Sequence, residues 1–222
     1  MHNQGPKYLL YAQFAQVAKA LSHPHKLELL ELLAQRERSV EALAKVAGIS
    51  VANTSRHLQQ LRRAGLVESR KEGLYVFYRV AGDDVIDLLG NLQRTGERHI
   101  GEVNRVVTGY FNDRDSLEAV SRKELLQRSK DGLVTVLDVR PPDEYESGHI
   151  PGAVNVPLAE IAQHITDLPG EKDIIAYCRG AYCVLAFEAV ATLREKGFKA
   201  RRLKEGYPEW KAAGLPVEGS ER

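Results

Sequence analysis

A short apolar run near the C-terminal end limits the fold of this chain more than any other feature. Ile174–Tyr177 contains only apolar or aromatic residues and ends directly at Cys178. A loop with Gly180 follows, and Val184–Val190 then shows helical spacing. Leu133–Val139 is a second short apolar segment. Short apolar strands separated by helices are typical of an open, mostly parallel sheet with helices on both faces, so we predict an α/β domain here.

Cys178 lies where such a sheet carries its reactive groups, because active sites of open α/β sheets lie beyond the carboxyl ends of strands. Loop amides and the positive end of the next helix would stabilise a thiolate at this position. The only other cysteine, Cys183, is in the same loop. With no N-terminal apolar run that resembles a signal peptide, the pair indicates a catalytic or sensory loop in a reducing, cytoplasmic setting.

The two halves of the chain differ in charge, and the length suits two domains of ordinary size. The first 112 of the 222 residues carry 15 Lys and Arg against 11 Asp and Glu, and the rest carry 16 against 19. The mildly basic half is the candidate for a polyanionic partner. No stretch approaches the roughly 18 apolar residues that would predict a membrane span. We predict domains over 1–109 and 118–222, with a linker over 110–117.

The first half reads as a set of helices followed by a hairpin. Apolar residues recur at helical spacing over 8–21 and again in the leucine-rich segment after Pro24. A third helix is predicted over 40–47, where Ser39 gives a start signal and Gly48 a stop signal, and a fourth from 50 to 64. A helix of about eight residues, a turn with glycine and a longer helix form the helix-turn-helix pattern.

The fourth helix carries polar side chains that could read base edges in a major groove or, as the alternative, form an ordinary solvated face. Residues 65–80 then predict two alternating strands around a basic, glycine-containing turn. Such a wing can lie along the DNA backbone or in the minor groove. The residues expected to contact DNA are Ser50, Asn53, Thr54, Ser55, Arg56, His57, Gln60, Arg70 and Lys71.

The segments Leu21–Leu27 and Ser55–Val67 resemble ArsR-type winged-helix repressors, over about residues 8–108. The resemblance implies a homodimer that reads a pseudo-palindromic operator in double-stranded DNA and leaves it when an inducer arrives. It also implies a dimer surface made by the first helix and by a helix over 84–107. Many members bind thiophilic metals through cysteines in the helix before the recognition helix. Here that stretch, Arg38–Ala44, has no cysteine, so we expect no metal, no cofactor and a signal that enters elsewhere.

The second half resembles the rhodanese domain over residues 117–217. The motifs that carry the likeness are Leu137–Arg140, Glu144–Tyr145, Gly148–Ala153, Glu205–Trp210 and Gly214–Val217. The resemblance implies that Cys178 accepts a sulfane sulfur as a persulfide and passes it to a thiol. The loop amides expected to hold the persulfide are those of Arg179, Gly180, Ala181, Tyr182, Cys183 and Val184.

Other residues of the rhodanese motifs are expected mainly to support the loop. Arg140 would pair with a carboxylate such as Glu144, and His149 with nearby backbone. Asp138 is the one most suited to a direct catalytic part, because it ends a central strand near the loop.

The loop departs from the rhodanese pattern at one position. Many rhodaneses carry arginine five residues after the nucleophile, where it helps to bind an anionic donor, and here that position is Cys183. Arg179 could supply the charge from a different place, but efficient thiosulfate transfer is not expected. Cys183 either resolves a persulfide on Cys178 to a disulfide or packs as a small apolar residue.

These features predict a DNA-binding transcriptional regulator whose rhodanese-like domain senses or transfers sulfane sulfur through a Cys178 persulfide. Two alternatives stay open. One is a sulfurtransferase enzyme that is tethered to DNA without switching, and the other is a thiol-based redox or metalloid-responsive regulator that uses both cysteines. The candidate catalytic residues are Cys178, Cys183, Arg179 and Asp138, and the predicted partners besides DNA and a second copy are a sulfane-sulfur donor or a thiol acceptor.

Overall fold

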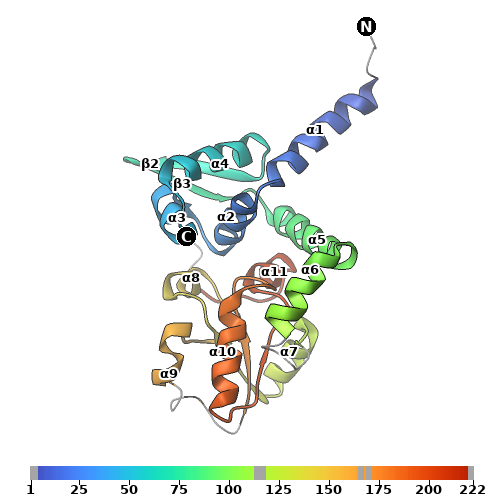
Figure 1. Cartoon of the computed structure of the whole chain (residues 1–222). Helices are drawn as coiled ribbons and strands as arrows, with labels where there is room; N and C mark the ends of the chain where they lie inside the picture. Colours follow the sequence, from blue (N-terminus) through green and yellow to red (C-terminus); the bar gives the residue numbers. More distant parts are fainter. Residues whose placement is uncertain (1–4, 113–118, 165–167, 169–171, 220–222) are drawn as a thin grey trace. The chain divides into compact units, whose positions relative to one another are not determined.

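The computed structural model describes residues 5–112, 119–164, 168 and 172–219. It divides the chain into two compact units, residues 1–89 and 90–222 (Figure 1). Of the predicted linker, residues 113–117 lie outside the described residues, and Val107–Asn112 forms a π-helical segment, η1. The predicted domain bounds therefore stay a prediction. Within the described residues no helix is both long enough and apolar enough to cross a membrane.

The first unit begins with four helices whose starts and ends follow from capping residues. They are α1 (Pro6–Leu21), α2 (Pro24–Gln35), α3 (Val40–Ala47) and α4 (Val51–Arg63). The Oγ atoms of Ser39 and Ser50 accept backbone N–H groups at 3.2 and 3.3 Å, which satisfies donors that a helix leaves open in its first turn. Gly48 ends α3 with a left-handed φ of 66°, a conformation that glycine adopts without strain.

A three-stranded antiparallel sheet completes this unit. The wing strands are β2 (Val67–Glu72) and β3 (Tyr75–Val80), and a third strand, β1 (Arg38–Ser39), pairs with β3 to give the order β1-β3-β2. Sequence reasoning missed β1 because two residues carry no periodic pattern. The core beneath the sheet is aliphatic, and each buried leucine contributes about 1.5–3 kcal/mol relative to an exposed one. Its fully buried members are Leu29, Leu30, Leu43, Leu58 and Leu61. The predicted winged helix-turn-helix is confirmed.

The sequence predicts one continuous helix over residues 84–107 after the wing. The structure instead has two helices there. The structure has α5 (Asp83–His99), then α6 (Gly101–Val106), with extended backbone at Ile100 between them (φ −109°, ψ 105°). A β-branched residue followed by glycine has low helix propensity, which accounts for the break at this point.

The second unit contains a four-stranded sheet of order β5-β4-β6-β7 in which every neighbouring pair is parallel. Its strands are β4 (Val134–Asp138), β5 (Val154–Asn155), β6 (Asp173–Tyr177) and β7 (Ala200–Arg202). The helical segments are α7 (Arg122–Lys130), α8 (Pro142–Ser147), η2 (Leu158–Glu160), α9 (Ile161–His164), α10 (Val184–Glu195) and α11 (Tyr207–Ala212). The predicted mostly parallel open sheet is confirmed.

Side chains alternate along the inner strands and so build two cores, one on each face of the sheet. Ile174 and Ala176 pack into a cluster with residues of α9 and α10, and Figure 1 shows α10 lying along the sheet. Ile175 and Tyr177 pack into the other cluster, with residues of α7 and α11. The alternation continues to Cys178, which belongs to the α10 cluster. Strand order and register thus bring the cysteine to the beginning of α10.

Candidate functional site

The two cysteines of the chain are joined in a disulfide, with their Cα atoms 6.2 Å apart. Cys178 follows β6, and Cys183 is the residue immediately before α10. Both are buried, Cys178 with 1% and Cys183 with 8% of its surface exposed. The two sulfurs lie within bonding reach and Cys183 also packs in the core cluster of α10, so the resolving role and the packing role both stay predictions.

The loop that carries the cysteines is held by the start of α11, which comes nearly thirty residues later. The N–H of Tyr207 donates to the carbonyl of Cys178 at 3.0 Å. Gly206 lies so close to the loop that an added Cβ would be 2.4 Å from the backbone nitrogen of Gly180. Within the loop, the N–H of Cys183 donates to the carbonyl of Gly180 at 3.2 Å, so this amide of the predicted ring is already engaged.

Arg179, which could supply the charge of the missing arginine from a different place, is paired with a carboxylate. Its Nε donates to both carboxylate oxygens of Glu144 at 3.0 Å, and its Nη2 donates to one of them at 2.7 Å. Glu144 is fully buried at α8. A buried carboxylate needs such a partner, since an unpaired charge in the interior is strongly unfavourable. Because Glu144 compensates its charge, Arg179 is a weaker candidate for the role of the missing arginine, which stays a prediction.

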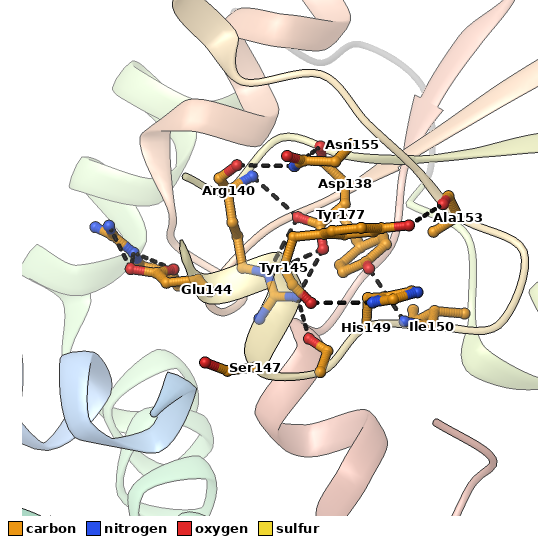
Figure 2. A network of polar contacts seen from close by, with 12 residues as sticks. Asp138, Arg140, Glu144, Tyr145, Ser147, His149, Ile150, Ala153, Asn155 and Tyr177 are labelled. Atoms are coloured by element: carbon orange, nitrogen blue, oxygen red, sulfur yellow. Dashed lines mark hydrogen bonds and ion pairs between the residues drawn. The ribbon is translucent and has the colours of Figure 1, made fainter. Parts of the chain in front are cut away.

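Asp138 and Arg140 form a buried ion pair at the end of β4, in the network drawn in Figure 2. Nη2 of Arg140 donates to Oδ2 of Asp138 at 2.6 Å and to the carbonyl of Gly148 at 2.7 Å. The backbone N–H of Arg140 donates to Oδ1 of Asp138 at 2.9 Å. Burial is the largest single influence and opposes the charge on Arg140, but the hydrogen bonds with Asp138 together with the nearby charges, first that of Asp138, raise the pKa of the guanidinium.

Two expectations bear on this ion pair. Arg140 pairs with a carboxylate, as expected for one such as Glu144, and the carboxylate that binds it in two-pronged fashion is that of Asp138. Asp138 follows Val134 and Val136 in the alternation of β4, whose cluster lies on the face opposite that of Cys178, so its catalytic part stays a prediction. The position of Asp138 at the end of a strand did not reveal which face of the sheet its side chain occupies.

The rest of the network joins three segments around the ion pair (Figure 2). His149 has its Nδ1 2.9 Å from the carbonyl of Tyr145, which confirms the expected backbone contact. The amide of Asn155 donates to the carbonyls of Asp138 and Arg140 at 3.0 and 2.9 Å. The hydroxyl of Tyr177 accepts the N–H of Ile150 at 3.1 Å, and burial raises the pKa of this phenol. The network therefore holds these segments of the rhodanese-like unit together.

Sequence reasoning missed Asn155, Gly206 and the partnership of Glu144 with Arg179. No motif or spacing singles these residues out, since each acts through a contact between segments distant in the chain. Gly206 belongs to the C-terminal rhodanese motif Glu205–Trp210, and this motif was the only sequence signal that pointed to it.

The exposed face of α4 contains most, but not all, of the residues predicted to contact DNA. Ser50, Asn53, Arg56 and Gln60 are exposed, and Ser55 is half-buried. Thr54 and His57 are buried, with 0% and 6% of their surfaces exposed. Helical spacing turns these two toward the core with Leu58 and Leu61, and the hydroxyl of Thr54 donates to the carbonyl of Ser50 at 3.0 Å. We therefore remove Thr54 and His57 from the DNA-contacting set.

The wing is less basic than its sequence suggested. Arg70 donates from Nη2 to Oε2 of Glu37 at 2.6 Å, makes a second ion pair with Glu72, and lies over the ring of Phe77. These carboxylates compensate its charge, so contact with a phosphate would require exchange of partners. Lys71 is exposed beside it, and it is the better candidate for contact with the DNA backbone.

A cluster of three imidazoles joins α2 to α4. The rings of His23 and His57 have centroids 4.5 Å apart, and His25 lies 5.4 and 6.2 Å from them. Nδ1 of His57 is buried without a hydrogen-bond partner. Burial, followed by the charges of His23, Arg56, Lys26 and His25, lowers the pKa of His57 below 6.5. Among the residues that the structure describes, no group of three His, Cys, Asp or Glu side chains is arranged to hold a metal ion.

We expect acid to weaken the packing of α4. The folded state favours neutral His57, whereas the unfolded chain takes up a proton near pH 6.5, so stability is lost as the pH falls below that value. Hydrogen exchange of α4 amides, corrected for intrinsic rates, should therefore show less protection at about pH 5.5 than at about pH 7.5. His57→Gln should reduce this difference, and exposed His99→Gln should not. An undiminished difference in His57→Gln would contradict the assignment.

Comparisons with known proteins agree with the two units. A family model for a helix-turn-helix domain matches residues 21–70, and one for a rhodanese-like domain matches residues 121–213. The HTH-type transcriptional regulator Rv0324 of Mycobacterium tuberculosis is 45% identical over 212 residues, which cover 96% of this chain and 93% of the relative. A sulfurtransferase of Allochromatium vinosum is 28% identical over 108 residues, 48% of this chain and 97% of that protein.

A solved structure is similar to part of the chain. It is the solution structure of the homodimeric winged helix-turn-helix DNA-binding domain Mb0332 from Mycobacterium bovis, a fragment of residues 1–100. The two share 42% sequence identity over 45% of this chain and 94% of that one, with a TM-score of 0.41.

Proposed function

Because the chain belongs to the HTH-type transcriptional regulators that join an ArsR-type winged helix to a rhodanese-like domain, we propose that reactive sulfur acting on Cys178 controls its binding to operator DNA. The observation that carries this proposal is the disulfide between Cys178 and Cys183 at the carboxyl end of β6. The closeness of the two sulfurs supports a second covalent state of the loop. A regulator needs such a state in the domain that receives its signal.

The DNA contacts of this proposal come from α4 and the wing. The exposed residues Asn53, Arg56 and Gln60 can donate to and accept from base edges in the major groove. Lys71 can meet phosphates beside the site, which would fix the register of the helix without reading sequence.

A second copy of the chain is the proposed partner of α1. Large apolar side chains of α1 have more than half of their surfaces exposed in the single chain. Contiguous apolar surface of this kind marks an interaction site in a soluble protein. The side chains of α1 concerned are Tyr8, Leu9, Leu10, Tyr11 and Phe14. A homodimer would cover them and would present two copies of α4 to a pseudo-palindromic operator.

The proposed chemistry has two steps. The Cys178 thiolate attacks the terminal sulfur of a sulfane-sulfur donor such as a polysulfide, forms an S–S bond, and releases the shortened donor as an anion. The Cys183 thiolate then attacks Sγ of the Cys178 persulfide, which forms the disulfide and expels hydrosulfide. The sulfane sulfur is reduced by two electrons, and the two thiols are oxidised to the disulfide. No other oxidant is needed.

The residues around the loop suit a sensor better than a thiosulfate enzyme. The position five residues after Cys178 holds Cys183 where an arginine would bind an anionic donor, and Arg179 is already paired with Glu144. When Cys183 converts the Cys178 persulfide to a disulfide, each protein molecule reacts with one sulfane sulfur and then reacts no further. An enzyme would instead pass the sulfur to an external acceptor and repeat the cycle.

A DNA-binding titration tests the proposal. Operator duplexes are first selected in vitro from random sequences, and affinity is then measured with and without polysulfide. We expect polysulfide to weaken binding by wild type about 5- to 150-fold, the usual range of coupling between two sites. Cys178→Ser should show no change. By linkage, saturating operator should shift the equilibrium between the dithiol and the disulfide of wild type toward the dithiol by the same factor.

Cys183→Ser is the matched variant, because it keeps the acceptor thiol and lacks the resolving one. Intact mass after polysulfide treatment should show added sulfur in Cys183→Ser and loss of two hydrogens in wild type. Equal weakening of DNA binding in wild type and Cys178→Ser would refute the proposal. Rapid sulfur transfer to an added thiol with unchanged DNA affinity would instead identify a tethered sulfurtransferase.

A further inference from the structure

Arg202 carries a positive charge toward the cysteine loop from a neighbouring strand. It is the last residue of β7 and is paired with Ala176 of β6 in the parallel sheet. Paired residues of neighbouring strands point to the same face of a sheet, and so do residues two apart along one strand. Arg202 therefore shares with Ala176 and Cys178 the face that α10 covers.

Two contacts place the guanidinium of Arg202 near Cys183. Its Nη1 lies 3.5 Å from the carbonyl oxygen of Ala181, two residues before Cys183. Its Cζ lies 4.2 Å from the ring centroid of Phe187, which follows Cys183 by about one helical turn and offers the cation its negatively polarised face. The charge of Arg202 thus lies close to the position where the loop has Cys183 instead of an arginine.

We infer that Arg202 supplies from β7 the positive charge that the loop lacks at position 183, and that it makes the reaction at Cys178 favour anionic sulfane-sulfur donors over neutral ones. The inference rests on the proposed function, in which this reaction is the first step of sulfur sensing. It adds a specificity-determining residue and the charge class of the donor.

The chemistry of the first step favours a cation at this place. A guanidinium attracts an anionic donor through its charge and its N–H groups, and the same charge stabilises the shortened donor that leaves as an anion. Arg202 is half-buried, so salt screens its charge less than that of a fully exposed side chain. Recognition of an anionic donor still suits a sensor, because Cys183 ends the reaction after one sulfur atom.

Two alkylating probes of nearly equal size measure the charge preference directly. Iodoacetate is anionic and iodoacetamide is neutral, and both react with a thiolate. The full-length, reduced Cys183→Ser protein leaves Cys178 as the only thiol, and intact mass gives the rate constant for each reagent. Because both reagents need the same thiolate, the ratio of the two rate constants does not depend on the pKa of the thiol.

Arg202→Met in the Cys183→Ser protein should lower the ratio of the iodoacetate rate to the iodoacetamide rate about tenfold, an effect in the range expected when one charge near a reacting anion is removed. Arg202→Lys should keep most of the ratio, since it keeps the charge. The emission of Trp210, in the core of the same unit, verifies that each variant is folded. Arg202→Gln gives the same comparison should the methionine variant fail to fold.

Arg201→Met is the matched control. Arg201 precedes Arg202 in β7, so it points to the other face of the sheet, where its Nη1 donates to Glu124 of α7 at 2.9 Å. Its removal should leave the ratio unchanged. An unchanged ratio in Arg202→Met, an equal fall in Arg201→Met, or a fall in Arg202→Lys as large as that in Arg202→Met would overturn the inference.

The outcomes separate this inference from the proposed function. If polysulfide leaves Cys178 unmodified while Arg202→Met still lowers the ratio, the sulfur-sensing proposal fails and the role of Arg202 in selecting anions holds. If polysulfide oxidises the wild-type loop and weakens DNA binding while the ratio is the same with and without Arg202, the proposed function holds and this inference fails.

Discussion

Arg140→Met is expected to destabilise the rhodanese-like unit by about 3–5 kcal/mol, the usual effect of removing one partner of a buried ion pair. The side chains of Asp138 and Arg140 are both fully buried. Without the guanidinium, the carboxylate keeps the N–H of Arg140 but loses the charge that compensates it. Such a loss is a large part of the 5–15 kcal/mol that stabilises a typical domain.

Denaturant unfolding followed by fluorescence measures this effect within the correct unit. Trp210 is the only tryptophan of the chain and lies in the core that α11 and α7 share with the sheet. Its emission therefore reports the unfolding of the rhodanese-like unit without a signal from the winged helix.

Arg201→Met is the matched control, because Arg201 pairs with Glu124 at 2.9 Å where both side chains are about a quarter or more exposed. Removal of this exposed ion pair should lower the free energy of unfolding by no more than about 1 kcal/mol. The double variant Asp138→Asn/Arg140→Met should be more stable than Arg140→Met, since the uncompensated charge is absent. Equal losses for Arg140→Met and Arg201→Met would contradict the importance of the buried pair.

Gly206→Ala is expected to slow disulfide formation in the cysteine loop about 100-fold, because a displacement near 1 Å of a reacting group has effects of that size. The backbone at Gly206 is ordinary (φ −98°), so alanine introduces no conformational strain there. The added Cβ would instead lie 2.4 Å from the carbonyl carbon of Arg179 and from the nitrogen of Gly180. The peptide bond between Arg179 and Gly180 would have to move away from α11.

The rate is followed as the loss of free thiols after polysulfide is added to the reduced protein. Gly101→Ala is the matched control, since its Cβ meets nothing within 4 Å and its backbone needs no positive φ. The Trp210 emission and the denaturation midpoint verify that the variant remains folded. DNA binding in the absence of sulfur should stay at the wild-type value. A wild-type rate in folded Gly206→Ala would show that the contact does not position the loop.

Much of the fold could be predicted because its elements leave local patterns. Helical spacing and the Ser39 and Ser50 caps predicted the winged helix, and the apolar run before Cys178 predicted an inner parallel strand. The short strand β1 and the break at Ile100 were missed. A two-residue strand is defined by its hydrogen bonds to β3 rather than by any sequence period, and the break depends on a single dihedral pair.

The residues of α4 show what a local sequence pattern can and cannot predict about burial. The sequence marked the polar residues of α4 but not which of them point inward. Thr54 and His57 share the inner face with Leu58 and Leu61, and this became clear only once α4 was packed against α2. Polarity alone does not report direction when a polar side chain lies on the buried stripe.

For the cysteine loop, the sequence by itself determined that the two thiols share one loop between a strand and a helix, and that an expected arginine is a cysteine. The tertiary structure decided the partners: it paired Arg179 with Glu144, placed Asp138 on the opposite face of the sheet, and brought Gly206 against the loop. The physical reason is that chemistry and spacing are local properties of a chain. The partner of a charge, the sheet face that a side chain occupies and a close contact between two backbones are fixed only when distant segments pack together.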